Sequence, residues 1–449
     1  EYSDAAGGHE PHEAVRSVLE EALALGQASP DRSADDDQQL ARVSIDLAFY
    51  LYVAHELEAA RALMRAGIAA LEPGPPTRGR AGLRARLGWT YWRAGPLADA
   101  PPILRQAIEE ARACGAEDVE RMALHDLGIA AGMLGDSRQS LALVEESLDL
   151  ARAANDRLLL TRCYINVPSL MYSNGETNER ILPLCSEGLD RARRSMDHAS
   201  ASWIAQNTAE NLAFAGRLSE AVPYTDEAIR AARTVGELTR LAWCLGQRGF
   251  IRLAMGDREG ARADIEESRR TISTVEPQSA IYDVLVDALF LWPDDPSAAS
   301  RSISAELRST DAALPSLLDA APTAARMALR IADAAGLEHD VAVFLGVTSR
   351  CSGPVRVLQA RWMDALRGDP APAAATLRAV ADEFEALGYP LPAADCRADA
   401  ALLARRADLD PTEDEAEARR LYTACGAVPL LGELPEDRWI QVTEITRPV

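Results

Sequence analysis

One turn signal recurs along this sequence at intervals of 40 residues. Glycine stands at positions 95, 135, 175, 216 and 256, and His55 holds the same place one interval earlier, which gives spacings of 40, 40, 40, 41 and 40 residues. Each position separates two stretches that carry apolar residues at helical spacing, such as residues 98–113 after Gly95. A fixed interval of this kind indicates a stack of helix pairs, because each pair buries its apolar face only against its neighbours.

The residue composition agrees with a helical array. Hydrophobic residues make up 48% of the 449 residues and aromatic residues only 5%, so alanine and leucine supply much of the apolar content. Both are strong helix formers. We therefore predict an all-α fold.

Small residues lie at fixed distances from each turn. Gly88 precedes Gly95 by seven residues, and Ala100 and Ala107 follow it by five and twelve residues. The same places are taken by Gly128, Ser140 and Ser147, by Ala209, Ala221 and Ala228, and by Gly249, Ala261 and Ser268, whereas the third of these copies departs from the pattern with Pro168 and Arg180. The spacing resembles the tetratricopeptide repeat, with a longer period than the usual 34 or so residues. The resemblance implies a right-handed α-solenoid of antiparallel helix pairs.

The repeat pattern divides the chain into five segments. Residues 41–275 contain six regular repeats, and residues 1–40 contain a truncated preceding repeat whose polar run, residues 28–39, we expect to form a loop. The period fails in residues 276–350, for which we expect an irregular helical segment, and repeat-like helix pairs resume over residues 351–430. Residues 431–449 form a tail.

Charge and residue usage exclude several classes of function. The formal net charge is −22, and every one of the 47 basic residues is arginine. An acidic chain is a poor partner for nucleic acid, and the absence of lysine excludes a Walker-type phosphate loop and a Schiff-base site. No apolar run reaches the length of a membrane span. Seven scattered cysteines without paired spacing indicate reduced core thiols in a cytoplasmic protein.

No group of residues has the spacing of an active site. The histidines at positions 9 and 12 could hold a metal, but a terminal segment with exposed histidines explains them as well. His125 and Asp126 are neighbours in sequence, so we expect their side chains to diverge on a helix, and no nucleophile is spaced to complete a triad. We predict no catalytic residue, no metal and no cofactor, and hence no enzyme.

The tetratricopeptide resemblance also assigns one face of each pair's first helix to a concave surface. Transferred by register, it makes the following residues candidates for ligand or partner binding: Phe49, Tyr52, Arg86, Trp89, Trp92, Arg93, His125, Met133, Arg162, Asn166, Tyr172, Trp203, Asn207, Phe214, Trp243 and Phe250. The same register places Gln206, Glu210 and Gln247 on this face. Four of the seven tryptophans belong to it, although aromatic residues are scarce.

Two interpretations of this aromatic face remain open. Aromatic rings interleaved with arginine and amide side chains suit a ligand with an apolar body and some polar or anionic groups. The same rings at helical spacing also suit simple packing against the next repeat. Asn166 and Asn207 occupy equivalent positions and could bind a peptide backbone, or could be ordinary solvated amides.

Some phrases resemble a particular class of protein. Residues 19–26, 108–128 and 417–427 are similar to the C-terminal repeat region of large ATP-binding bacterial regulators of the LuxR and maltose-regulator types, whose arginine- and alanine-rich versions are common in actinobacteria. The resemblance implies a non-catalytic sensor that binds a small-molecule or peptide effector. Because the chain begins with Glu1, we expect it to be part of a longer protein with upstream ATPase and DNA-binding domains. The alternative is a scaffold that holds a partner helix or tail in the same groove.

Overall fold

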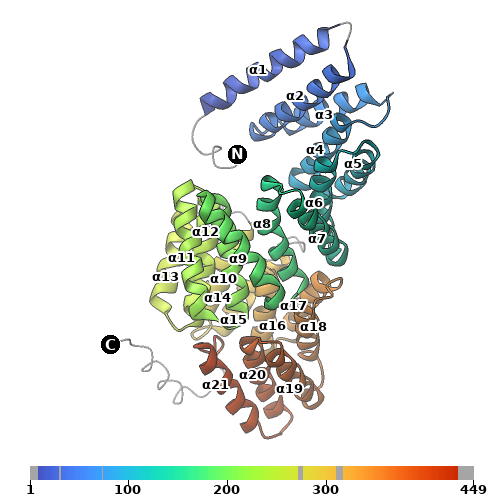
Figure 1. Ribbon diagram of the computed structural model, residues 1–449. Coiled ribbons are helices and arrows are strands. Elements are labelled where there is room, and N and C mark those ends of the chain that lie inside the picture. Colours follow the sequence, from blue (N-terminus) through green and yellow to red (C-terminus); the bar gives the residue numbers. More distant parts are fainter. Residues whose placement is uncertain (1–8, 30–31, 73, 272–276, 310–316, 433–449) are drawn as a thin grey trace. The chain divides into compact units, whose positions relative to one another are not determined.

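The computed structural model describes residues 9–29, 32–72, 74–271, 277–309 and 317–432. Within these ranges the chain forms 21 α-helices, one short 3-10 helix and no strand (Figure 1). Consecutive helices pack against each other as antiparallel pairs, which confirms the all-α repeat fold. The chain divides into two compact units, Glu1–Leu170 (unit 1) and Met171–Val449 (unit 2).

Unit 1 holds the first repeats. Its elements are α1 (His9–Ala28), α2 (Ala34–Val53), α3 (Leu57–Leu71), α4 (Arg78–Ala94), η2 (Leu97–Asp99), α5 (Ala100–Cys114), α6 (Glu117–Met133), α7 (Ser137–Ala153) and most of α8 (Arg157–Asn174). The first helices of successive pairs, α2, α4 and α6, also contact one another. This pattern is that of a helical repeat.

Unit 2 continues from the end of α8. Its helices are α9 (Asn178–Ser195), α10 (His198–Phe214), α11 (Leu218–Val235), α12 (Leu238–Ala254), α13 (Arg258–Thr271), α14 (Pro277–Leu291), α15 (Pro296–Ser309), α16 (Leu317–Arg330), α17 (Ala334–Thr348), α18 (Pro354–Ala365), α19 (Pro370–Ala386), α20 (Pro390–Arg406) and α21 (Thr412–Cys425). In its described residues, the stretch without a regular period thus contains four helices, α14 to α17. The limits that we gave to the sequence segments remain predictions, and most of the expected tail lies outside the described residues.

The turns inside the helix pairs have a common backbone conformation. His55, Gly135, Gly175, Gly216 and Gly256 all have φ between 62° and 85°, a region that glycine enters at no steric cost. The left-handed residue ends one helix and lets the chain reverse into the next. The remaining anchor, Gly95, has an extended conformation (φ −160°), and the 3-10 helix η2 makes the turn there.

The small residues of the repeat lie where paired helices touch. A Cβ atom on Gly88 would come within 2.6 Å of Leu104, and one on Gly128 within 2.6 Å of Val144. Ala100 and Ala107 are completely buried. The small side chains therefore set the close approach of the two helices in each pair.

The loop expected over residues 28–39 is shorter than predicted, because α2 begins at Ala34. Ser33 caps the helix: its hydroxyl accepts the backbone N–H of Asp36 at 3.2 Å, and the Asp36 carboxylate accepts the Ser33 backbone N–H at 2.8 Å. The acidic residues of this run lie in the first turn, where they offset the helix dipole. The prediction of a loop was wrong for the second half of this run, because its polar residues form the capping box and the first turn of α2.

Distant parts of the chain are joined within unit 2. The N–H of Gly353 donates to the carbonyl of Asn174 (3.1 Å) and that of Val355 to the carbonyl of Gly175 (3.0 Å). Arg356, which is 1% exposed, donates to the carbonyls of Tyr172 (2.6 Å) and Ser173 (3.2 Å). We call these contacts the α8–α18 clasp. The clasp connects segments about 180 residues apart within unit 2.

No helix within the described ranges is long and apolar enough to span a bilayer.

Candidate functional site

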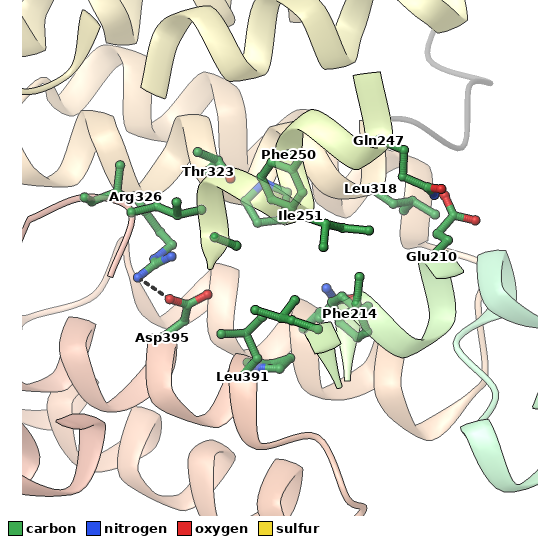
Figure 2. A pocket seen from close by; sticks show the side chains of 18 of the residues that line it. Glu210, Phe214, Gln247, Phe250, Ile251, Leu318, Thr323, Arg326, Leu391 and Asp395 are labelled. Carbon is green, nitrogen blue, oxygen red and sulfur yellow. Dashed lines mark ion pairs between the residues drawn. The ribbon is translucent and has the colours of Figure 1, made fainter. Parts of the chain in front are cut away.

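Unit 2 contains a half-open cavity of about 120 Å³. Its walls come from α10, α12, α16, α18 and α20, from single residues of neighbouring helices, and from the segment after α21. Figure 2 shows side chains from these elements converging around it. Cavities of similar size in other proteins accept a molecule as large as benzene. The cavity is therefore large enough for a small ring or a single apolar side chain.

The middle of the cavity is apolar. Phe214 and Phe250 face it together with the aliphatic side chains of Ile251, Leu318 and Leu391 (Figure 2). The rings are held by further aromatic contacts outside the cavity: Phe214 lies 5.7 Å from Tyr389 and Phe250 lies 6.4 Å from Tyr282, measured between ring centroids. These contacts fix the orientation of the two phenylalanines.

One end of the cavity carries a buried ion pair. Arg326 donates to the carboxylate of Asp395 at 2.9 Å, and the hydroxyl of Tyr422 donates to the same carboxylate at 2.5 Å. Behind the cavity wall Asp399 binds Arg326 (3.1 Å) and Arg330 (2.7 Å). The positive charges of Arg326 and Arg330 are thus paired with the negative charges of Asp395 and Asp399.

Burial perturbs the ionisation of this cluster. It lowers the pKa of Arg330 to about 10 and raises the pKa of Asp395 above its usual range. The nearby arginine opposes the second effect, so the Asp395 carboxylate depends on Arg326 to stay charged. Since every charge of this end has an internal partner, the end serves better as a wall than as a binding group.

The other end of the cavity is polar and incompletely bonded. The side chain of Gln247 is 2% exposed, and neither its Oε1 nor its Nε2 atom has a hydrogen-bond partner within the described part of the chain. Gln247 and Glu210 point toward each other at this end (Figure 2). The hydroxyl of Tyr282 donates to Glu210 at 3.4 Å. A buried amide without partners is costly, so a group that bonds it would gain free energy on binding.

The segment after α21 closes one side of the cavity with Val428, Leu430 and Leu431. Two hydrogen bonds hold it in place. The N–H of Val428 donates to the carbonyl of Ala254 (2.8 Å), and the indole N–H of Trp292 donates to the carbonyl of Leu431 (2.9 Å). The wall is therefore an extended segment anchored at two points.

Three of the sequence-predicted residues line this cavity. Tyr172, Phe214 and Phe250 all face it, and so do Glu210 and Gln247, which the same register placed on the concave face. Tyr172 contacts Phe214 with 6.0 Å between ring centroids. The register argument thus identified five lining residues, from α8, α10 and α12.

The other predicted residues of unit 2 lie outside the cavity. Trp203 and Trp243, on α10 and α12, contact each other with ring centroids 6.2 Å apart. Arg240 lies over both indoles. Asn207, on the same helix as Trp203, is 7% exposed. This group is packed between adjacent repeats.

In unit 1 the predicted aromatic residues contact one another across adjacent helices. Tyr52 of α2 lies 4.7 Å from Trp89 of α4, and Trp89 lies 6.5 Å from Trp92, in each case between ring centroids. Arg86 stacks over both Phe49 and Trp89, and Arg93 stacks over Trp92. Trp89 is 3% exposed. These contacts fit packing between repeats, and a binding role for the group stays a prediction.

His125 belongs to a buried polar network on α6 and α8. Its Nδ1 atom lies 3.3 Å from Asp126 Oδ1, and its Nε2 atom lies 3.2 Å from Asn166 Nδ2, while Arg162 pairs with Asp126 at 2.7 Å. The expectation that His125 and Asp126 diverge is wrong, because their side chains bend toward each other in the interior. Complete burial lowers the pKa of His125. Met133, at the end of α6, is 42% exposed.

Among the cavity residues that sequence reasoning missed are those of α16 and α20. They include Leu318, Thr323, Arg326, Leu391 and Asp395. No repeat register reaches α16, since the 40-residue period fails before it. One signal was present: an arginine and an aspartate in otherwise alanine-rich helices indicate an internal ion pair.

No cluster of three or more histidine, cysteine, aspartate or glutamate side chains suited to a metal occurs among the residues that the structure describes. The thiols of Cys163 and Cys185 are completely buried, as predicted, and burial raises the pKa of each to about 12. Such thiols are poor nucleophiles.

No family model matches the sequence, and no curated protein matches it. Solved structures do. The apo form of the quorum sensor NprR from B. thuringiensis is 12% identical, and the match covers 77% of this chain and 95% of that chain with a TM-score of 0.54. The fold is tetratricopeptide-like. NprR in complex with its cognate peptide NprX is also 12% identical, and that match covers 77% of this chain and 99% of that chain with a TM-score of 0.54. The apo form of RapI is 11% identical, and its match covers 76% of this chain and 93% of that chain with a TM-score of 0.53. At this identity the likeness concerns the fold alone.

Proposed function

We propose that this chain is a non-catalytic regulatory binding protein that encloses part of an effector in the unit 2 cavity. The observation that carries the proposal is the Gln247 amide, which is buried at the end of an apolar cavity and has no hydrogen-bond partner among the residues that the structure describes. Natural proteins leave few such groups unbonded, and a binding site is one setting that explains them.

Binding can be coupled to regulation through the elements that form the walls. The cavity joins α10 and α12 to α16, to α20 and to the segment at residues 428–431. An effector that contacts all of them favours the arrangement in which they lie together, and it shifts the population toward that arrangement. We therefore assign to this unit the sensor role implied by the resemblance to LuxR-type regulators, with upstream ATPase and DNA-binding domains as its proposed targets.

The effector is either a small molecule or a peptide that inserts one apolar side chain. The cavity volume of about 120 Å³ is too small for a whole peptide. The structural likeness to NprR, which has been seen in complex with its cognate peptide, supports the second form. In that form the rest of the peptide lies outside the cavity, and the binding resembles an anchor residue in a pocket.

Filling the cavity tests the proposal. Ala213 lines the cavity and is 9% exposed, so Ala213→Leu places a larger side chain into the space. We expect small aromatic fragments to bind the wild-type protein in ligand-observed NMR, and the variant to lose this binding at least tenfold. Ala375→Leu, at an exposed position of α19, is the matched control and keeps it.

Equal binding by the wild-type protein and Ala213→Leu contradicts the proposal. If no fragment binds the wild-type protein at millimolar concentration, the scaffold interpretation replaces it.

A further inference from the structure

We propose that the effector group bound in the cavity is a neutral primary carboxamide, or a lactam of the same geometry, on a compact apolar body, and that it pairs with the side-chain amide of Gln247 through two hydrogen bonds. This inference rests on the proposed function and names the ligand class. The hydrogen-bonding atoms that select the class are those of Gln247 alone.

Both polar atoms of the Gln247 side chain lack a partner. Oε1 is an acceptor and Nε2 is a donor, the residue is 2% exposed, and neither atom is hydrogen-bonded to a residue that the structure describes. Since the two atoms are in the same state, the conclusion holds for either orientation of the amide. A ligand that bonds only one of them leaves the other buried and unbonded, which is costly.

The two unbonded atoms favour a group that donates and accepts at once. An ammonium group has only donors and would leave Nε2 unbonded, whereas a carboxylate has only acceptors and would leave Oε1 unbonded. A primary carboxamide carries an N–H and a C=O on the same side, so it can face the Gln247 amide with two parallel hydrogen bonds. A trans peptide unit cannot, because its N–H and C=O point in opposite directions. Gln247 therefore selects a primary carboxamide or a cis lactam over an ion and over a peptide backbone.

The apolar body of such a ligand has a place beside Gln247. Gln247, Phe250, Ile251 and Ala254 all line the cavity from α12, at the spacing of one helix face. This face is polar at Gln247 and apolar over the following two turns, each of which advances about 5.4 Å. Phe214 lines the same space from α10. A ring attached directly to the carboxamide would therefore lie against the two phenylalanines.

Three probes test the pairing: benzamide, isoindolin-1-one and N-methylbenzamide. The last two are of equal size, but the lactam holds its N–H on the same side as its carbonyl, whereas N-methylbenzamide is trans. Their binding to the full chain at pH 7 can be measured by isothermal titration calorimetry or ligand-observed NMR. We expect isoindolin-1-one and benzamide to bind at least about fivefold more tightly than N-methylbenzamide, which is the effect of one hydrogen bond.

A variant locates the preference at Gln247. Gln247→Met keeps the length of the side chain and removes its donor and acceptor, so isoindolin-1-one and N-methylbenzamide should then bind within about twofold of each other. The free variant should melt no lower than the wild type, because an apolar side chain replaces an unbonded amide. Gln139→Met, the same substitution at an exposed position of α7, is the matched control and keeps the preference.

A fourth probe identifies the source of the carboxamide. N-acetylphenylalaninamide carries the same group at the end of a peptide. Tighter binding of this compound than of benzamide assigns the carboxamide to an amidated peptide, and weaker binding assigns it to a small molecule. Both orders support the pairing with Gln247.

The outcomes distinguish this inference from the proposed function. Equal binding of isoindolin-1-one and N-methylbenzamide to the wild-type protein, or a preference that survives in Gln247→Met, overturns the pairing and leaves the cavity as a binding site. If none of these probes binds but other small aromatic fragments do, the inference fails alone. If no fragment binds, the proposed function fails with it. Should Gln247→Met not fold, the order of the probes on the wild-type protein decides alone.

Discussion

At the scale of single residues, Asp340 on α17 illustrates how unit 2 keeps acids in its interior. The side chain is completely buried; Oδ2 accepts the hydroxyl of Ser304 at 2.7 Å, and Oδ1 has no partner within the described ranges. Burial raises the pKa of Asp340 from 3.8 to about 6, against the smaller opposite effect of Ser304. The folded protein therefore holds this proton more tightly than the unfolded chain does.

This shift predicts a pH-dependent effect of Asp340→Asn. A raised pKa stabilises the folded state at low pH, and the contribution is lost as the pH rises from about 4 to about 6. The variant, which cannot ionise, should be more stable than the wild type at pH 7.5, by up to roughly 3 kcal/mol, with little difference at pH 4. Urea unfolding at both pH values measures it, with Asp190→Asn on the surface of α9 as control. The same stability difference at both pH values contradicts the assignment.

Gln247 differs from Asp340 in a way that matters for function. A buried carboxyl group can lower its cost by taking up a proton, whereas an amide has no such route. Both atoms of the Gln247 amide remain unbonded beside a cavity. The unbonded amide of Gln247 therefore lowers the stability at every pH, and it faces the cavity.

At the scale of elements, the sequence predicted the repeat well because its signals are local. The left-handed turn at Gly135 and the small contact at Gly128 each depend on a few neighbouring residues. The capping box at Ser33 was missed because a polar run suits both a loop and a first helical turn. The α8–α18 clasp was out of reach, since it joins residues about 180 positions apart.

The clasp predicts unequal effects of the same substitution at two turns. Gly135 (φ 82°) and Gly175 (φ 85°) have the same conformation, but a Cβ at Gly135 meets nothing within 4 Å, whereas one at Gly175 would come within 2.4 Å of Arg356. Gly135→Ala should cost about 1 to 2 kcal/mol for the left-handed backbone. Gly175→Ala should lower the free energy of unfolding by clearly more than this, because its methyl group also collides with Arg356.

Hydrogen exchange gives the local measurement for this pair. The N–H groups of Gly353 and Val355 donate across the clasp. Their hydrogen exchange should be faster in Gly175→Ala than in the wild type, and it should be unchanged in Gly135→Ala. Slow exchange of both groups in Gly175→Ala, together with equal losses of stability in the two variants, would show that the clasp tolerates the added methyl group.

At the scale of the whole molecule, the cavity depends on contacts that no single repeat contains. The register of the first helices identified Tyr172, Phe214 and Phe250, because the positions before each turn repeat along the chain. It could not identify Arg326 or Asp395, which reach the cavity from helices beyond the regular period. The lining residues of the first helices were therefore predictable, and the residues that complete the wall from other helices were not.

The aromatic residues of the predicted face divide between two roles. The rings of Tyr52 and Trp89 pack edge to face between successive helices, and so do those of Trp203 and Trp243. Phe214 and Phe250 belong to the same predicted face but line the cavity. The difference comes from the neighbouring elements: α16, α20 and the segment at residues 428–431 form the rest of the cavity wall around Phe214 and Phe250.

The most direct test of the account is a crystal structure of the full chain soaked with benzyl alcohol. We predict that its ring lies against Phe214 and Phe250 and that its hydroxyl lies within hydrogen-bond distance of the Gln247 amide. An empty cavity in crystals where the probe binds elsewhere on the chain would contradict the claim that this cavity is the effector site.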